Sequence, residues 1–273
     1  MEKIRVLQCG FPKSGNYGFY RTIRLIMDEQ GLFVSYKQVS GISQIIKRLC
    51  GEYVFVPDMD MVDSFYYMDG RFTLEFPHPS CKFVEVDAQM LFTTSTFLWT
   101  HEKAEIIKNR LLENITHRFY VLRDGRDVVN SMVHHVTRQE MLAVRPEYRY
   151  QSPEEVYGDM ELFKHYVREW RDHVRSYLAN RDHFVCLKLE ELMSEPVKTV
   201  QKVASVLGIP VDAERLAEKI TFNSLSKTAP AHLRRGKKGD WRNYFTEEHK
   251  RVFKELAGRE LIELGYERDT QWQ

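Results

Sequence analysis

The feature that most constrains the fold is a short apolar segment that runs directly into a glycine-bearing turn. Residues 4–9 are apolar and β-prone, which predicts a buried strand. The turn, residues 10–18, contains three glycines, and apolar residues then recur at helical spacing at Phe19, Ile23, Ile26 and Met27. A strand, a glycine loop and a helix N-terminus bring several backbone N–H groups around one point, so this segment predicts a site for a phosphate-like group.

Lys13 adds a full positive charge to this loop. The loop differs from the nucleotide-triphosphate P-loop, G-x-x-x-x-G-K-[ST], because its lysine precedes Gly15 instead of following a second glycine. Taken alone, the segment fits an anion site and an ordinary strand-to-helix turn with an incidental lysine equally well. The rest of the chain has to decide between these two interpretations.

Composition limits the partners that the chain can have. Of the 273 residues, 43% are hydrophobic and 29% are charged, an ordinary globular composition that predicts one α/β domain over residues 1–273. Forty basic and 39 acidic side chains give a formal net charge of +1, so no global positive field is present to recruit nucleic acid. Any anion binding must therefore be local.

The cysteines and the N-terminal segment predict a cytoplasmic protein. Cys9, Cys50, Cys81 and Cys186 lie far apart and form no C-x-x-C motif, which predicts buried free thiols and argues against zinc. The first residues lead straight into a strand, without an apolar stretch that is long enough for a signal peptide or a membrane span.

Strand patterns alternate with helix patterns, which predicts a three-layer α/β fold with a mainly parallel sheet flanked by helices. Asp69-Gly70 stands between two β-prone aromatic runs, so residues 64–76 predict a hairpin. Its aromatic residues fit either one wall of an acceptor pocket or a half-buried hairpin at the surface, and the second interpretation is favoured. The other predicted strands are 53–57, 81–86, 119–122 and 183–189, and the main predicted helices are 42–49, 102–113, 153–179, 195–207, 212–218 and 246–264.

A second candidate anion site follows the predicted strand at 119–122. Arg123 lies at the carboxyl end of that strand, where parallel sheets bind ligands, and Ser131 follows about two turns into the next helix. An arginine and a serine hydroxyl are a suitable pair for a second phosphate. Asp124 and Asp127 are predicted to cap the helix and to form ion pairs instead of acting in catalysis.

Two further segments carry charge or a titratable group. Residues 234–239 hold four basic side chains and two glycines, which fits either a phosphate-binding loop anchored by aromatic neighbours or a solvated basic loop. His101 lies where a predicted loop meets a helix, so it is a candidate general base. On local sequence alone, a structural histidine is the more common outcome.

Three segments together resemble the sulfotransferases that use 3′-phosphoadenosine-5′-phosphosulfate (PAPS). Residues 12–15 (PKSG), 120–131 (YVLRDGRDVVNS) and 234–246 (RRGKKGDWRNYFT) are similar, in order, to the family patterns P-K-[SA]-G-T-T-W, R-[ND]-x-[RK]-D-x-x-x-S and R-K-G-x-x-G-[DE]-W-K. The resemblance implies a P-loop-like fold with a phosphosulfate-binding loop, and transfer of the sulfuryl group from PAPS to a hydroxyl or amine of a small-molecule, lipid or carbohydrate acceptor. It also implies PAP as the product and no metal.

The resemblance implies a role for each matched position. His101 corresponds to the family's base, and Lys13 would stabilise the leaving oxygen as well as bind the phosphosulfate. The 5′-phosphosulfate loop would consist of Lys13, Ser14, Gly15, Asn16, Tyr17 and Gly18. The 3′-phosphate would be held by Arg123, Ser131, Arg234, Arg235 and Gly236.

The chain departs from the family pattern at several positions. Asn16-Tyr17-Gly18 replaces Thr-Thr-Trp, so the tryptophan that stacks on adenine is missing at Gly18. Phe19 and Tyr20 are the alternatives that stay open as its substitute, and Phe222 is predicted to pack on the adenine. Trp99 stands where many members have a lysine beside the base, and Leu189 stands where some have a tyrosine. Two alternatives stay open, a P-loop kinase that uses ATP and magnesium and a catalytically silent nucleotide-binding protein. A homodimer and a monomer are both open as the assembly.

Overall fold

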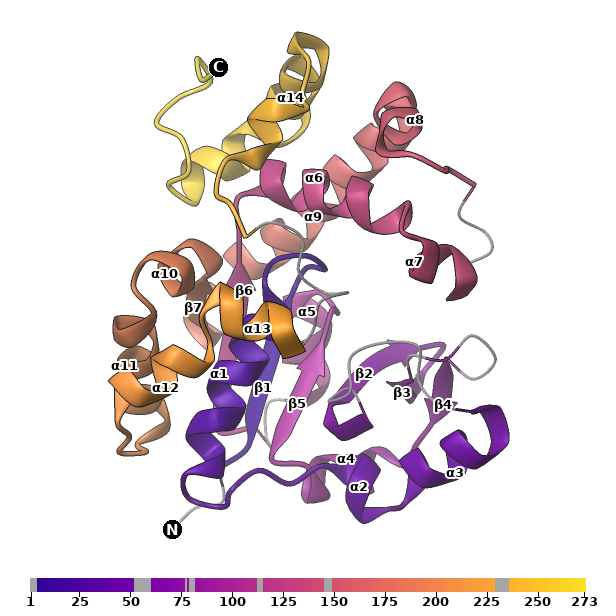
Figure 1. Cartoon of the computed structure of the whole chain (residues 1–273), viewed down its shortest axis with the longest axis vertical. Helices are drawn as coiled ribbons and strands as arrows, with labels where there is room; N and C mark the ends of the chain where they lie inside the picture. Colours follow the sequence, from indigo (N-terminus) through magenta and orange to yellow (C-terminus); the bar gives the residue numbers. More distant parts are fainter. Residues whose placement is uncertain are drawn as a thin grey trace.

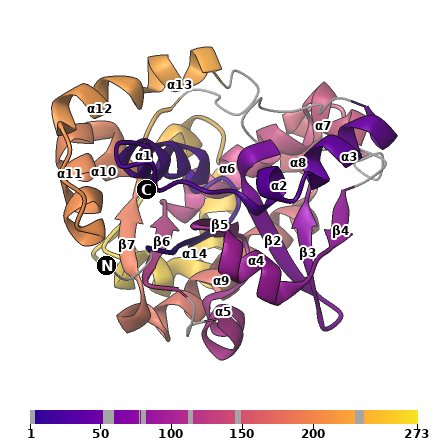
Figure 2. The same cartoon turned by 90° about the horizontal axis from the view of Figure 1, so that it is seen from below.

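The computed structural model describes residues 4–51, 60–76, 78, 82–111, 115–144, 149–228 and 236–273. The predicted strand at 53–57 lies outside these residues, as do Cys81, Arg234 and Arg235. The described part of the chain forms a central sheet with helices on both of its faces (Figure 1, Figure 2).

The described strands form one seven-stranded sheet. They are β1 (Val6–Gly10), β2 (Asp63–Met68), β3 (Arg71–Glu75), β4 (Phe83–Glu85), β5 (Phe97–Thr100), β6 (His117–Leu122) and β7 (Val185–Lys188). Their order is β4-β3-β2-β5-β1-β6-β7, with β2, β5, β1, β6 and β7 parallel and β3 and β4 antiparallel at one edge. The prediction of a mainly parallel sheet is therefore confirmed.

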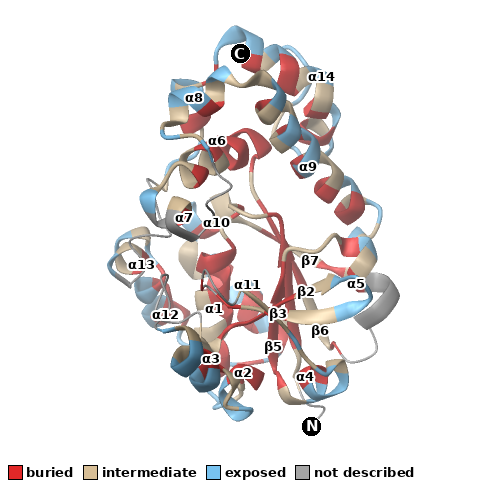
Figure 3. Ribbon diagram, turned by 90° about the vertical axis from the view of Figure 1, so that its right-hand side faces the viewer, coloured by how far each residue is buried: buried red, intermediate tan, exposed pale blue. Residues whose placement is uncertain are grey.

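Helices bury both faces of this sheet, and the buried strands lie between them (Figure 3). One face is covered by α1 (Asn16–Asp28), α10 (Leu189–Ser194), α11 (Pro196–Leu207), α12 (Ala213–Lys219) and α13 (Phe222–Thr228). The other face is covered by α5 (Ala104–Leu111), α6 (Gly125–Val136), α9 (Met160–Leu178) and α14 (Glu247–Glu263). The shorter helices are α2 (Tyr36–Val39), α3 (Ile42–Cys50), α4 (Ala88–Thr94), α7 (Gln139–Val144), α8 (Pro153–Gly158), η3 (Arg181–His183) and η4 (Asp240–Asn243). In the described ranges, no helix is long and apolar enough to cross a membrane.

The predicted hairpin forms, but it is part of the central sheet and not an attachment at the surface. Asp69 and Gly70 both have positive φ angles, 49° and 84°, as a tight two-residue turn requires. β2 pairs in parallel with β5, so Ser64 lies opposite Trp99 in the sheet. The sequence pattern at 81–86 predicts a buried strand, whereas β4 is the edge strand and is half-buried to exposed.

The predicted extent of one long helix is wrong. The segment 153–179 is two helices, because Asp159 leaves the helical conformation and its carboxylate caps α9 by accepting from the Leu162 N–H. Residues 87–98 contain α4 and then the start of β5. The sequence also does not predict α10 and α13, which have only six and seven residues.

Ion pairs and ring contacts of Arg126 connect the C-terminal residues to α6. Its guanidinium pairs with Asp124 at 2.7 Å and with Glu267 at 2.5 Å. It also lies 4.4 Å and 4.5 Å from the ring centroids of Trp241 and Trp272. Pairing with two carboxylates offsets the cost of burying this charge. The Asp124 carboxylate also accepts from the Arg126 backbone N–H at the start of α6, which confirms its predicted capping and ion-pair role.

Candidate functional site

The predicted phosphate loop follows β1, at the carboxyl edge of the parallel strands. Lys13 and Gly15 both have positive φ angles, 69° and 98°, so the backbone bends sharply before α1 begins at Asn16. The Ser14 N–H donates to the Phe11 carbonyl at 3.2 Å and closes the turn. A loop of this shape at a helix N-terminus presents backbone N–H groups to an anion.

Neighbouring side chains fix the shape of the loop. The Asn16 side-chain amide donates to the Phe11 carbonyl at 2.8 Å, and the Gln8 amide donates to the Asn16 carbonyl at 2.9 Å. Leu189 packs directly on Gly15, where an added Cβ would lie 2.6 Å from Leu189 Cδ1. Glycine is therefore required at position 15 for its backbone conformation and for space.

Arg123 brings the second predicted anion site to this loop. It follows directly after β6, and its Nη1 donates to the Lys13 carbonyl oxygen at 3.1 Å. Ser131 lies further along α6, which begins at Gly125, and is half-buried. The structure thus joins Arg123 to the phosphate loop, while a role of Ser131 in phosphate binding stays a prediction.

Asp127 brings the third segment to α6. Its carboxylate accepts from the Gly239 N–H at 2.6 Å and from the Trp241 N–H at 3.1 Å. Burial raises the pKa of Asp127, although the charge of Arg123 and these two N–H groups act in the opposite direction. The segment after residue 236 is therefore held beside the helix that carries Ser131.

Gly236 and Phe222 lie against each other. Gly236 has a φ of 58°, and a Cβ added there would lie 2.3 Å from the ring of Phe222. Phe222 is the first residue of α13. Gly236, which the family resemblance assigns to the 3′-phosphate, is thus in contact with Phe222, which is predicted to pack on the adenine.

His101 lies just beyond β5 and is tied to the neighbouring strand. Its Nδ1 is 2.6 Å from the carbonyl oxygen of Gly10. Because a carbonyl can only accept, Nδ1 carries the proton, and Nε2 keeps a lone pair that can take up another. The rings of Trp99 and Tyr66 lie 5.7 Å and 6.5 Å from the imidazole, measured between centroids.

Charges around His101 shift its pKa in opposite directions. Burial lowers the pKa from its ordinary value, and the positive charge of Lys13 adds to the lowering. The hydrogen bond to Gly10 and the negative charge of Glu75 raise it, and the net shift is downward. His101 is therefore neutral at neutral pH, the state that a general base requires.

Leu192 fills the space beside Gly18, the position where the family pattern has tryptophan. A Cβ added at Gly18 would lie 3.0 Å from Leu192 Cδ2. Leu192 is buried and belongs to α10. A tryptophan at position 18 would therefore collide with α10 unless that helix moved.

His173 and Glu75 are neighbours of His101 that the sequence analysis misses. His173 Nε2 bonds the His101 carbonyl oxygen at 3.2 Å, and the Glu75 carboxylate accepts from the Tyr66 hydroxyl at 3.3 Å. His173 follows Trp170 by about one helical turn, so it lies on the buried stripe of α9. That register is the signal that could have identified a buried histidine, whereas no local pattern distinguishes Glu75.

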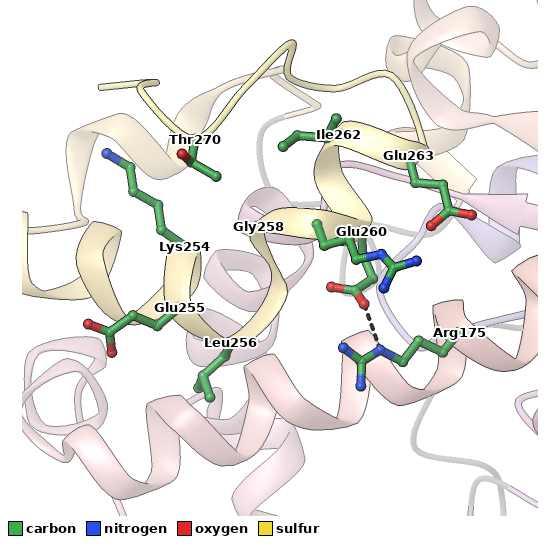
Figure 4. A pocket seen from close by; sticks show the side chains of 10 residues that line it. Arg175, Lys254, Glu255, Leu256, Gly258, Glu260, Ile262, Glu263 and Thr270 are labelled. Carbon is green, nitrogen blue, oxygen red and sulfur yellow. Dashed lines mark hydrogen bonds and ion pairs between the residues drawn. The ribbon is translucent and has the colours of Figure 1, made fainter.

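A separate hollow of about 500 Å³ lies between α9 and α14 (Figure 4). The Nε of Arg175 donates to Glu260 Oε1 at 2.6 Å and links the two helices there. α14 is kinked at Ala257, whose φ of −143° is not helical. The residues that line this hollow include none of the predicted site residues, so it does not belong to the candidate site.

The described cysteines are free thiols, and the described residues contain no candidate metal site. Cys9, Cys50 and Cys186 are free thiols, and burial raises the pKa of Cys9. Within the described ranges, no group of three or more His, Cys, Asp or Glu side chains could hold a metal ion.

Known proteins share both sequence and fold with this chain. It is 27% identical to the flavonol sulfotransferase-like protein of Flaveria bidentis over 172 residues, and this aligned region covers 54% of each chain. It is 25% identical to cytosolic sulfotransferase 1 of Danio rerio over 196 residues, and this aligned region covers 62% of each chain. The chain thus spans less than two thirds of the length of these curated relatives.

The structural comparison and the family comparison agree. The fold is similar to that of mouse sulfotransferase SULT7A1 complexed with PAP, with a TM-score of 0.60, 19% identity, and 96% of this chain and 85% of that one covered. The family described as "Sulfotransferase domain" matches residues 3–265. Because this match covers nearly the whole sequence, the chain belongs to the sulfotransferase domain family.

Proposed function

We propose that the protein is a PAPS-dependent sulfotransferase that moves the sulfuryl group to a hydroxyl or amine of an acceptor. One observation carries the proposal: Arg123 donates to the Lys13 carbonyl while Asp127 binds the Gly239 N–H. The three segments that resemble family motifs therefore meet at one edge of the sheet. Membership of the sulfotransferase domain family supports the same activity, and the similar mouse structure is a complex with PAP.

The donor would be held at two anion sites. The loop around Lys13 binds the 5′-phosphosulfate, because its backbone N–H groups and the start of α1 favour negative charge. The 3′-phosphate lies near Arg123 and the segment that Asp127 holds. The residues proposed for the two sites are Lys13, Ser14, Gly15, Asn16, Tyr17 and Gly18 for the first, Arg123, Ser131, Arg234, Arg235 and Gly236 for the second, and Phe222 for the adenine.

His101 acts as the general base in this proposal. Its Nε2 takes the proton from the acceptor oxygen or nitrogen as that atom forms a bond to sulfur, and the bond from sulfur to the bridging oxygen breaks in line. The leaving oxygen develops negative charge, which Lys13 and the backbone N–H groups of the loop stabilise. The Nδ1 hydrogen bond to Gly10 supports this role, because it leaves Nε2 as the basic nitrogen.

A small molecule with an aromatic or apolar body is the proposed acceptor. The rings of Trp99 and Tyr66 flank the imidazole of His101, and the hairpin that carries Tyr66 extends the sheet at this point. The relative from Flaveria bidentis is named for a flavonol, which is such a compound. Lipids and carbohydrates are the alternative acceptors.

We also propose that residues 1–273 act as one domain in the cytoplasm. Strands from residue 6 to residue 188 share one sheet, which supports a single domain. The free thiols Cys9, Cys50 and Cys186 are compatible with a reducing compartment.

Calorimetric titration followed by a turnover assay tests the proposal. PAP, AMP and ATP with magnesium are titrated separately, and transfer from radiolabelled PAPS is then measured with phenols, amines, sterols and sugars. We expect PAP to bind at least about tenfold more tightly than AMP, because only PAP offers a second phosphate to Arg123. We expect transfer to at least one phenol.

The two rival functions predict different results in the same experiment. A P-loop kinase would bind ATP with magnesium more tightly than PAP and would transfer phosphate. A catalytically silent protein would bind PAP and transfer sulfate to none of the acceptors. Preferential binding of ATP would exclude the proposed donor, since the site would then discriminate by the triphosphate.

A further inference from the structure

We propose that His173, on α9, is a positioning residue that holds the base His101 in place through the His101 backbone carbonyl. The inference rests on the proposed function, in which His101 takes the acceptor proton. His173 lies on α9, and its Nε2 is 3.2 Å from the backbone carbonyl oxygen of His101. Because the carbonyl can only accept, Nε2 of His173 carries the proton.

Tyr120 fixes the other nitrogen of the same ring. Its hydroxyl, on β6, lies 2.7 Å from Nδ1 of His173, which is the nitrogen without a proton and therefore accepts. The Tyr120 ring is stacked on Tyr177 with 3.9 Å between centroids and 13° between planes, so the hydroxyl is held in place. Both ring nitrogens of His173 are thus occupied, and neither its tautomer nor its orientation can change without loss of a buried hydrogen bond.

Two further hydrogen bonds hold the segment that directly follows His101. The Glu105 N–H donates to the hydroxyl of Ser176, which lies about one turn after His173 on α9. The thiol of Cys9 donates to the Glu102 carbonyl at 3.1 Å. Hydrogen bonds from α9 and from β1 therefore hold the backbone around His101 in place.

The ring of His173 also touches the phosphate loop. Phe11, which accepts from the Ser14 N–H, lies edge-on to His173 with 5.6 Å between ring centroids. One buried side chain thus contacts both the loop proposed to hold the donor and the carbonyl of the proposed base. A change at His173 would alter the distance between base and donor without removing either.

His173 acts through geometry and not through proton exchange. Burial lowers its pKa to about 3, and the nearby charges of His101 and Lys103 add to the lowering. The groups that act on His173 electrostatically are thus His101 and Lys103, and those that act on His101 are Lys13 and Glu75. His173 is therefore neutral at neutral pH, and its Nε2 proton is held by the His101 carbonyl, so its role is to hold the backbone of His101.

Substitutions on α9 test this role. His173→Gln keeps an amide N–H that can reach the His101 carbonyl, whereas His173→Leu removes both hydrogen bonds. We expect H173L to lower kcat about 10- to 100-fold with the Kd for PAP within about threefold of wild type, and H173Q to stay within about fivefold in kcat. His165→Leu, an exposed histidine on the same helix, is the control. A kcat of H173L within about twofold of wild type would overturn the proposal.

A second variant and a spectroscopic measurement keep the test independent of folding and of turnover. Tyr120→Phe retains the stacked ring and loses only the hydroxyl, and we expect kcat to fall about 3- to 10-fold while the protein still unfolds in one cooperative thermal transition, at a temperature lowered by about 2–4 °C for each kcal/mol that the lost hydrogen bond contributes. Nitrogen NMR of histidine-labelled protein is expected to show His101 with its proton on Nδ1, and to show a shifted His101 Nδ1 signal in H173L and in Y120F, because the imidazole moves relative to the Gly10 carbonyl. An unaltered His101 signal in both variants would contradict this inference, whether or not the wild type transfers sulfate. If the wild type transfers no sulfate but the His101 signal changes in the variants, only the proposed function is contradicted.

Discussion

The Nδ1 atom of His101 lies 2.6 Å from the carbonyl oxygen of Gly10, the last residue of β1. β1 and β5 are neighbouring parallel strands, so this bond joins the ends from which the phosphate loop and His101 emerge. A Cβ at Gly10 would lie 2.8 Å from the Val121 carbonyl oxygen, which leaves no room for a larger residue. The separation of His101 from the loop around Lys13 is therefore set by the sheet itself.

Replacement of the base is expected to separate catalysis from binding. His101→Ala should lower kcat by about 10² to 10⁴-fold, the usual contribution of a general base. The Kd for PAP should stay within about threefold, because the proposed phosphate contacts come from other residues. Rates with PAPS and a phenol, together with calorimetric titration of PAP, check this against the control His165→Ala. Turnover of H101A near that of the control would exclude His101 as the base.

The pH dependence should reflect the lowered pKa of His101. The group is active when neutral, so kcat/KM should rise with pH through a pKa below about 6.5 and be level at neutral pH. Burial is the largest cause of the lowering, and Glu75 opposes it. Glu75→Gln should therefore move the acid limb to still lower pH, whereas Glu85→Gln, on the exposed edge strand, should leave it in place. A limb that moves upward in E75Q would show that the Glu75 charge does not act on His101.

The buried histidine on α9 should make stability depend on pH. The pKa of His173 is about 3 in the folded protein, against 6.5 for an ordinary histidine. Between these values the unfolded state binds a proton that the folded state does not, so stability is lost as pH falls below about 6.5. The slope from one such group approaches about 1.4 kcal/mol per pH unit. H173Q should show a shallower fall in urea denaturation between about pH 6.5 and pH 5, and equal slopes would rule out a neutral buried His173.

Local sequence patterns predict the elements that surround the phosphate loop. The apolar run in β1 and the helical spacing of Phe19, Ile23 and Met27 lead to a strand and a helix in which these residues are fully buried. The break at Asp159 is not predictable in this way, because the apolar stripe continues across it. Only the folded chain shows that the backbone of Asp159 leaves the helical conformation at the end of α8 and that its carboxylate caps α9.

The surroundings of the candidate base depend on contacts between distant segments. The motifs predict Lys13, Arg123 and the segment around Gly239, and the structure brings them together through Arg123 and Asp127. The position of the hairpin depends on the parallel pairing of β2 with β5, which no local pattern specifies. The same holds for His173, whose contact with the His101 carbonyl joins residues 72 positions apart.

Loss of Asp127 is expected to weaken binding of the 3′-phosphate selectively. Its carboxylate accepts two backbone N–H groups, and their loss from a buried site costs about 1–3 kcal/mol each. Asp127→Ala should therefore loosen the segment from Gly236 to Trp241 and reduce the preference for PAP over AMP by at least about tenfold. Asp212→Ala, which removes a similar cap at the exposed start of α12, serves as the control. An unchanged ratio of the two Kd values in D127A would show that this segment does not read the 3′-phosphate.

Gly18→Trp introduces the residue of the family pattern and is expected to destabilise this protein. The Cβ would lie 3.0 Å from Leu192 Cδ2, and the indole would then occupy the position of the α10 side chain. Overpacking of this kind costs about 1–3 kcal/mol in the free energy of unfolding. Leu192→Ala alone is expected to cost about 2–5 kcal/mol through the cavity that it leaves. The two changes should compensate, so the double variant should be more stable than the sum of the single losses predicts, by about 1 kcal/mol or more in urea denaturation. Strict additivity would show that Leu192 does not occupy the space that a tryptophan at position 18 needs.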